Sequence, residues 1–124
     1  MFDVCVVGHI TKDIVKIGNE TKMMPGGTAY YASIALKRLG ANVCVATKVA
    51  KEDLFLLDEL KKEKIPIFLG ETPKTTIFTN IYHSSSDERE QRVKDIASPF
   101  SSKDVKDISS KVFHLGPLSK KIFL

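Results

Sequence analysis

The sequence lacks tryptophan, contains only two cysteines, and has no apolar stretch near the roughly 20 residues that a membrane-spanning helix needs. These shortages argue against a disulfide-rich secreted scaffold and against a membrane partner. The first residues carry an acid, Asp3, and no basic segment ahead of an apolar run, so they are not typical of a signal peptide. We therefore expect a cytoplasmic protein.

Neither sign of charge dominates, since 19 Lys and Arg residues stand against 15 Asp and Glu residues. The densest basic cluster, Lys61, Lys62 and Lys64, alternates with Glu59 and Glu63, as the solvated face of a helix does. No aromatic residues are interleaved with these lysines, as a single-strand nucleic-acid binder would require. We predict no nucleic-acid partner, and binding through this face stays an alternative that rests on charge alone.

The length of 124 residues, 43% of them hydrophobic, corresponds to one ordinary globular domain. Cys5 and Cys44 lie in apolar runs with no histidine next to the pair in the sequence. Both are predicted to be reduced and buried, and no metal site is expected.

Short apolar runs alternate with helical patterns over the first part of the chain. The predicted strands are 2–7, 42–49 and 66–69, and the predicted helices are 28–39 and 51–64. Strands that alternate with helices predict an α/β fold with a mainly parallel sheet.

Two further segments break this alternation and are predicted to leave the main sheet. Residues 14–24 read as a hairpin around Gly18-Asn19, and residues 75–83 and 91–97 read as a second hairpin around a polar turn at 84–90. Within 75–83, one set of side chains alternates with another: Ile77, Thr79 and Ile81 against Phe78, Asn80 and Tyr82. A short helix near Ser101, with Ser101 or Ser102 as its cap, and a strand over 112–115 follow.

The helix over 28–39 is predicted to be mostly buried, because its polar stripe, marked by Ser33 and Lys37, is narrow. Thr28 is a candidate N-cap, and Gly40 is a candidate C-terminal stop.

Pro25-Gly26-Gly27-Thr28 opens this helix and is the best local candidate for a binding site. Glycines let the backbone approach a ligand closely, and a helix N-terminus presents N–H groups to oxygen atoms. A glycine turn without any ligand explains the same spacing. The segment matches neither a Walker loop nor a dinucleotide fingerprint.

Asp13 follows the first strand, in GHITKD, where α/β folds place ligand-binding groups. Its carboxylate could accept hydrogen bonds from sugar hydroxyls, although an aspartate in a turn or at a helix cap would give the same sequence pattern. His9, His83 and His114 are scattered and are expected to be structural.

Together these segments resemble the N-terminal portion of the ribokinase-like (PfkB) carbohydrate kinase family. The resemblance is carried by GHITKD (Gly8–Asp13), by PGGTAYYASIALKRLGANVCVATKVAKED (Pro25–Asp53), and by DEREQRV (Asp87–Val93) and VFHLGPL (Val112–Leu118). It implies a doubly wound, mainly parallel sheet, incomplete in this chain, with a small β-sheet lid. The core would comprise 1–13, 25–73 and 98–124, and the lid strands 14–24 and 75–97.

The resemblance also implies a function, namely transfer of a phosphoryl group from ATP, with Mg²⁺, to a hydroxyl of a sugar or nucleoside-like substrate. Asp13, Gly26, Gly27, Thr28 and Tyr31 would bind the substrate; Tyr31 stands where many sugar kinases of the family have Asn. Lid strands of the family often pair between subunits, which implies a homodimer.

The catalytic aspartate of the family lies in a Gly-Ala-Gly-Asp motif, and this sequence has no such motif. We therefore expect no catalytic and no cofactor-binding residue in this chain, which alone should be inactive. The alternative is a non-catalytic ligand-sensing or interaction module derived from the same fold.

Overall fold

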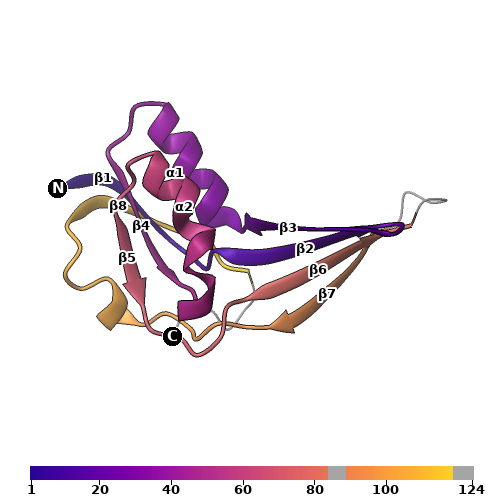
Figure 1. Cartoon of the computed structure of the whole chain (residues 1–124). Helices are drawn as coiled ribbons and strands as arrows, with labels where there is room; N and C mark the ends of the chain where they lie inside the picture. The colour runs from indigo at the N-terminus through magenta and orange to yellow at the C-terminus, as the bar shows by residue number, and fades with distance from the viewer. Residues whose placement is uncertain (84–88, 119–124) are drawn as a thin grey trace.

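The computed structural model of the chain describes residues 1–83 and 89–118 (Figure 1). The elements are the strands β1 (Phe2–Val7), β2 (Thr11–Ile17), β3 (Glu20–Gly26), β4 (Val43–Lys48), β5 (Ile67–Gly70), β6 (Ile77–Tyr82), β7 (Arg89–Asp95) and β8 (Ser110–Leu115), the helices α1 (Thr28–Arg38) and α2 (Asp58–Lys62), and the 3-10 segments η1 (Lys51–Leu57) and η2 (Ser102–Asp104). The predicted turn at 84–90 falls mostly outside the described residues, as does the end of the chain from residue 119.

The first sheet has the order β5-β4-β1-β8, and all its pairings are parallel. Helices α1 and α2 lie on one face of it (Figure 1), over a cluster that includes Val6, Val45 and Leu60. The other face packs Val7 against Phe100 in a second cluster. The predicted parallel α/β architecture is confirmed.

Both cysteines are free and fully buried, as predicted. Cys5 and Cys44 are in register on adjacent strands of the parallel sheet. Removal from water raises the pKa of the Cys44 thiol to about 12, because burial disfavours the charged thiolate. Both are therefore small apolar parts of the core.

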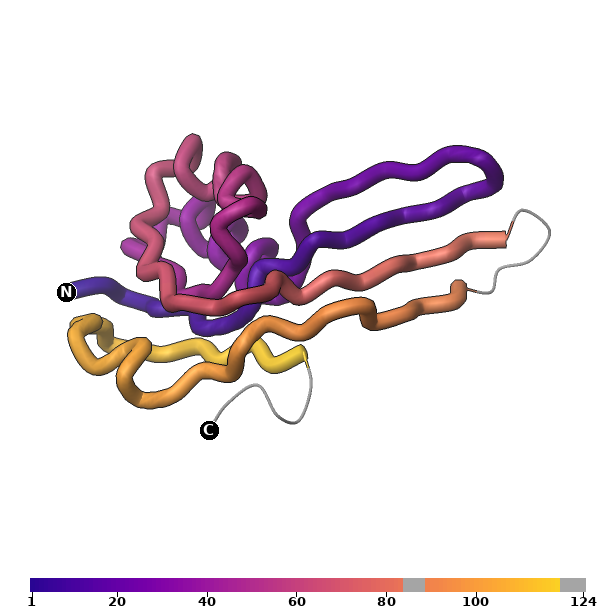
Figure 2. The backbone as a smooth tube through the Cα atoms, turned by 60° about the horizontal axis from the view of Figure 1, so that its bottom comes forward, coloured from indigo at the N-terminus to yellow at the C-terminus, as the bar shows by residue number. Residues whose placement is uncertain are grey.

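The second sheet has the order β3-β2-β6-β7, and its strands project away from the first sheet (Figure 2). We call this sheet the lid. The predicted hairpin around Gly18 is present, with Gly18 at φ 58°, and it is longer than predicted because β2 starts at Thr11 and β3 ends at Gly26. The strands predicted over 75–83 and 91–97 correspond to β6 and β7. The central pair, β2 with β6, is parallel, and the outer pairs are antiparallel.

The single helix predicted over 51–64 is wrong in detail. The segment divides into η1 and α2, and the backbone at Asp53 leaves the helical region with φ −113° and ψ 18°. The predicted apolar face is nevertheless present, because Leu56, Leu57 and Leu60 are all buried.

Two predictions for α1 are also wrong. Only Ala29 and Ser33 are buried, so the helix is not mostly buried, and Ser33 faces inward with its hydroxyl donating to the Tyr30 carbonyl at 3.0 Å. The N-cap is Gly27, and Thr28 is the first helical residue. Gly40 does end the helix, at φ 95° with its N–H donating to the Lys37 carbonyl.

Strand β8 lies at one edge of the parallel sheet and exposes apolar side chains on both of its faces. Val112 is 54% exposed, Phe113 41% and Leu115 55%. Parallel sheets are normally covered on both faces, so this edge is unusually apolar for a solvent-facing strand. Within residues 1–83 and 89–118, no helix is long and apolar enough to span a membrane.

Candidate substrate site

The carboxyl ends of β1 and β8 meet where the strand order reverses. From β1 the chain goes to β4 and β5 on one side of the sheet, and β8 returns on the other. Gly8 and Gly116 follow these two strands and are so close that a Cβ on Gly8 would lie 2.8 Å from the Gly116 carbonyl oxygen. Open α/β sheets bind ligands in the crevice at such a point.

A cavity of about 510 Å³ opens beside this point, between the core and the lid. Its walls come from β2, the start of α1, the lid strands β6 and β7, and the segment after β8. The lining residues are Thr11, Asp13, Gly27, Thr28, Tyr31, Ala32, Phe78, Gln91 and Leu118. The structure therefore brings Asp13 of β2 to the same cavity as Gly27, Thr28 and Tyr31 at the start of α1.

Asp13 is held in place by its neighbours in the lid. It pairs with Met24 on one side and with Phe78 on the other. The Thr11 hydroxyl donates to Asp13 Oδ1 at 2.6 Å. Gly26 lies directly under the carboxyl group, and a Cβ there would come within 2.7 Å of Asp13 Cγ. Gly26 thus makes room for the carboxyl group and does not line the cavity itself.

Gly27 places the start of α1 against the end of β1. It has φ 94°, and a Cβ on it would lie 2.5 Å from the His9 carbonyl oxygen. Its own carbonyl accepts from the N–H groups of Tyr30 and Tyr31, at 3.1 and 3.3 Å. The N–H groups of Thr28 and Ala29 precede these first bonds, at the end of α1 that borders the cavity.

The lid supplies residues that sequence reasoning missed as site residues. Phe78 lines the cavity beside Asp13, and Gln91 Nε2 donates to Asn80 Oδ1 at 3.1 Å. The alternation had placed Phe78 and Asn80 on one face of their strand, but nothing local indicated that this strand would pair with the one carrying Asp13.

His9 is structural, in agreement with the expectation. It is buried, its Nε2 donates to the Ser98 carbonyl at 2.8 Å, and its ring stacks on Phe100 with centroids 4.5 Å apart. Burial lowers the pKa of the His9 ring, so the neutral form is favoured there. His83 and His114 are exposed.

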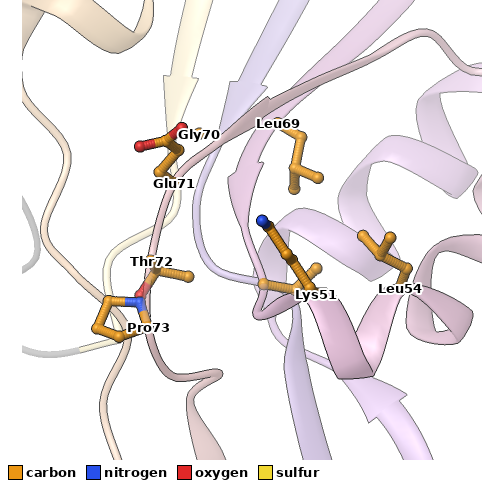
Figure 3. Close-up of a pocket in the computed structure, with 8 residues that line it drawn as sticks. Lys51, Leu54, Leu69, Gly70, Glu71, Thr72 and Pro73 are labelled. Carbon is orange, nitrogen blue, oxygen red and sulfur yellow. The ribbon is translucent and has the colours of Figure 1, made fainter.

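A larger cavity, of about 840 Å³, lies elsewhere, between η1 and the segment that follows β5 (Figure 3). Lys51 extends between Leu54, Leu69 and the Gly70–Pro73 segment, and the walls are mainly apolar (Figure 3). It contains none of the residues predicted for substrate binding. The smaller cavity is the better candidate for a polar substrate, because a carboxylate and a helix N-terminus converge on it.

Among the described residues, no three His, Cys, Asp or Glu side chains gather in a way that could hold a metal ion. The described residues therefore offer no set of three protein ligands for a magnesium ion.

Solved kinase structures have a similar fold. A pyrophosphate-dependent kinase in the ribokinase family, solved as a sulfate complex, is 27% identical to the chain with a TM-score of 0.88; the match covers 98% of this chain and 43% of that one. The chain has the ribokinase-like fold. A pyrophosphate-dependent kinase in the ribokinase family, complexed with a pyrophosphate analog and myo-inositol, is 26% identical with a TM-score of 0.86, over 98% and 42% of the two chains.

Other kinases share the ribokinase-like fold at lower identity. A fructokinase from Halothermothrix orenii is 22% identical with a TM-score of 0.73, and the match covers 91% of this chain and 45% of that one. The chain thus spans less than half the length of the kinases to which it is similar. No family model and no curated protein matches the sequence.

Alanine at Gly27 should destabilise the protein more than alanine at Gly40. Both residues have a positive φ, 94° and 95°, but a Cβ at Gly40 meets nothing within 4 Å whereas one at Gly27 meets the His9 carbonyl. We expect Gly40→Ala to cost about 1 kcal/mol of unfolding free energy from backbone strain, and Gly27→Ala to cost ~1–3 kcal/mol more from overpacking. Urea unfolding measures both, and equal losses would contradict the close approach.

Proposed function

We propose that this chain is the substrate-binding and lid portion of a carbohydrate kinase, which transfers a phosphoryl group to a hydroxyl of a sugar-like polyol. The observation that carries the proposal is the Asp13 carboxylate, held by Thr11 and lining the same cavity of about 510 Å³ as the N-terminal end of α1. A carboxylate accepts hydrogen bonds from hydroxyl hydrogens, and helix N–H groups donate to hydroxyl oxygens, so the two together suit a ring with several hydroxyls.

The remaining walls of the cavity support the same class of ligand. The Gln91 amide can both donate and accept hydrogen bonds. Tyr31 and Phe78 offer aromatic surface to the C–H face of a ring. One similar kinase was solved with myo-inositol. We therefore place inositols beside sugars and nucleosides as candidate substrates.

The phosphoryl donor is proposed by resemblance only. ATP with Mg²⁺ is the donor that the family resemblance implies, whereas the similar kinases at 27% and 26% identity described above are pyrophosphate-dependent. Phosphoryl transfer needs charge stabilisation around the phosphates. The Gly-Ala-Gly-Asp motif that provides it in the family is absent from this sequence, so we propose that these 124 residues bind substrate without transferring phosphate. A ligand-sensing module would use the same cavity.

Replacing Asp13 tests the binding site. In a thermal-shift panel of myo-inositol, fructose, ribose and adenosine, at least one compound should raise the Tm of the wild-type chain. Asp13→Asn should weaken binding of that compound roughly 10–100-fold, because hydrogen bonds to a charged group contribute about 1.5–3 kcal/mol. Asp107→Asn, at an exposed position, is the matched control and should bind normally. Binding of none of these compounds by the wild-type chain, or equal binding by Asp13→Asn, would contradict the proposal.

We also propose that two copies of the chain pair through the lid. Strand alternation and register place Ile14, Met23, Ile77 and Ile81 on the face opposite Asp13, and Met23 is 44% exposed. Phe78 is unsuitable for testing this idea because it lines the cavity. The same face also carries Lys16 and the Arg92–Glu90 ion pair, so the apolar side chains form a patch in a mixed surface, which a second copy would cover.

A charge at Met23 should separate such a dimer. In size-exclusion chromatography with light scattering, the wild-type chain should have the mass of a dimer, and Met23→Asp should have that of a monomer. Leu39→Asp changes an apolar side chain that is 85% exposed on the core, and it should leave the dimer intact. A monomeric wild-type chain, or a dimeric Met23→Asp, would refute the lid dimer.

A further inference from the structure

We propose that Lys12 and Asp53 are positioning residues that set the angle between lid and core, and thereby the place of the Asp13 carboxylate over the cavity. Lys12 Nζ lies 3.1 Å from Asp53 Oδ1, with side chains 27% and 8% exposed. The pair joins β2 of the lid to η1 of the core. The proposal rests on the substrate site proposed above and goes beyond it.

The two neighbouring residues Lys12 and Asp13 point in opposite directions. Successive side chains of a strand alternate between its faces, so Lys12 leaves the face opposite the one on which Asp13 meets the cavity. The Lys12 backbone N–H donates to the Thr76 carbonyl at 2.9 Å, which places the residue where β2 first meets β6. The contacts of the Lys12 side chain are therefore made at the base of the lid, next to Asp13, the residue proposed to bind substrate.

The partner is built into an irregular part of the core. Asp53 is the residue at which η1 departs from helical geometry, and its backbone N–H donates to the Ala50 carbonyl at 2.9 Å. The Lys12 ammonium also lies 5.8 Å from the centre of the Phe55 ring, on the same segment. Two contacts of the same cation with η1 define one preferred lid orientation, and a mostly buried pair is little screened by salt.

Neutral hydrogen bonds also join the lid to the core, and they do not depend on the ion pair. The Thr75 hydroxyl, ahead of β6, accepts from the Ala50 N–H at 2.8 Å, and the Thr47 hydroxyl of β4 accepts from the Ile10 N–H, ahead of β2, at 3.0 Å. Both threonines are buried. Because these bonds remain when the ion pair is removed, the lid can stay attached while its orientation relaxes.

The test removes both charges together, since a single replacement would leave one buried charge unpaired. The variant Lys12→Met/Asp53→Asn keeps the shapes of both side chains. The matched control, Lys74→Met/Asp95→Asn, removes an ion pair of 3.7 Å near the base of β6 whose lysine is 66% exposed. Lys12→Arg, which keeps the charge, is the conservative variant.

Two readouts are compared. Hydrogen exchange of the β2 amides, relative to those of β4, should rise about tenfold in the double variant and stay unchanged in the control. Affinity for the polyol that binds best in the panel above should fall about tenfold, and Lys12→Arg should keep it within a few-fold of wild type.

Unchanged exchange in the double variant, or faster exchange with unchanged affinity, would overturn the positioning role. If the wild-type chain binds no polyol, the proposed substrate site fails, and the exchange readout alone still decides whether the pair holds the lid.

Discussion

His9, Ile10 and Thr11 carry the chain from the parallel sheet into the lid, and all three are buried. This short connection is the constraint on which the rest of the structure depends. The Ile10 N–H donates to the Thr47 hydroxyl at the end of β4, and the His9 carbonyl leaves space only for a glycine at position 27. The end of β1, the start of α1 and the base of β2 are therefore fixed against one another.

The candidate site follows from that arrangement. Two residues after the connection, the chain reaches Asp13, and Gly27 caps the helix whose N-terminal end lines the same cavity. A carboxylate and a helix N-terminus have opposite hydrogen-bonding preferences, and a polyol satisfies both. The larger cavity beside Lys51 has mainly apolar walls with Glu71 among its lining residues, and none of the residues predicted to bind substrate contributes to it (Figure 3).

Local patterns were sufficient to predict most strands and the hairpin at Gly18, because turn residues and strand periodicity act over a few positions. They were insufficient for 51–64, where the backbone breaks at Asp53, whose partner Lys12 lies 41 positions away in sequence. They also overestimated the burial of α1, because an apolar composition does not say how much neighbouring structure covers a helix. Similar kinases are more than twice as long as this chain.

Some residues of the candidate site could be predicted from the local sequence, and others depend on pairings between distant segments. Asp13 and the segment from Gly26 to Thr28 could be selected because each follows a strand or opens a helix. Phe78 and Gln91 could not, because their place at the cavity depends on the parallel pairing of β2 with β6 and on the register of β7. Such pairings join distant segments and leave no local mark in the sequence.

The central claim is that a polyol binds between Asp13 and the start of α1. Amide chemical-shift mapping of the isotope-labelled chain during a titration with myo-inositol, fructose, ribose or adenosine tests it most directly. Saturable shifts confined to the Asp13, Gly27, Thr28 and Gln91 region are the predicted result. Saturable shifts centred on Lys51, Leu69 and Thr72, or none with any of the four, would contradict the account.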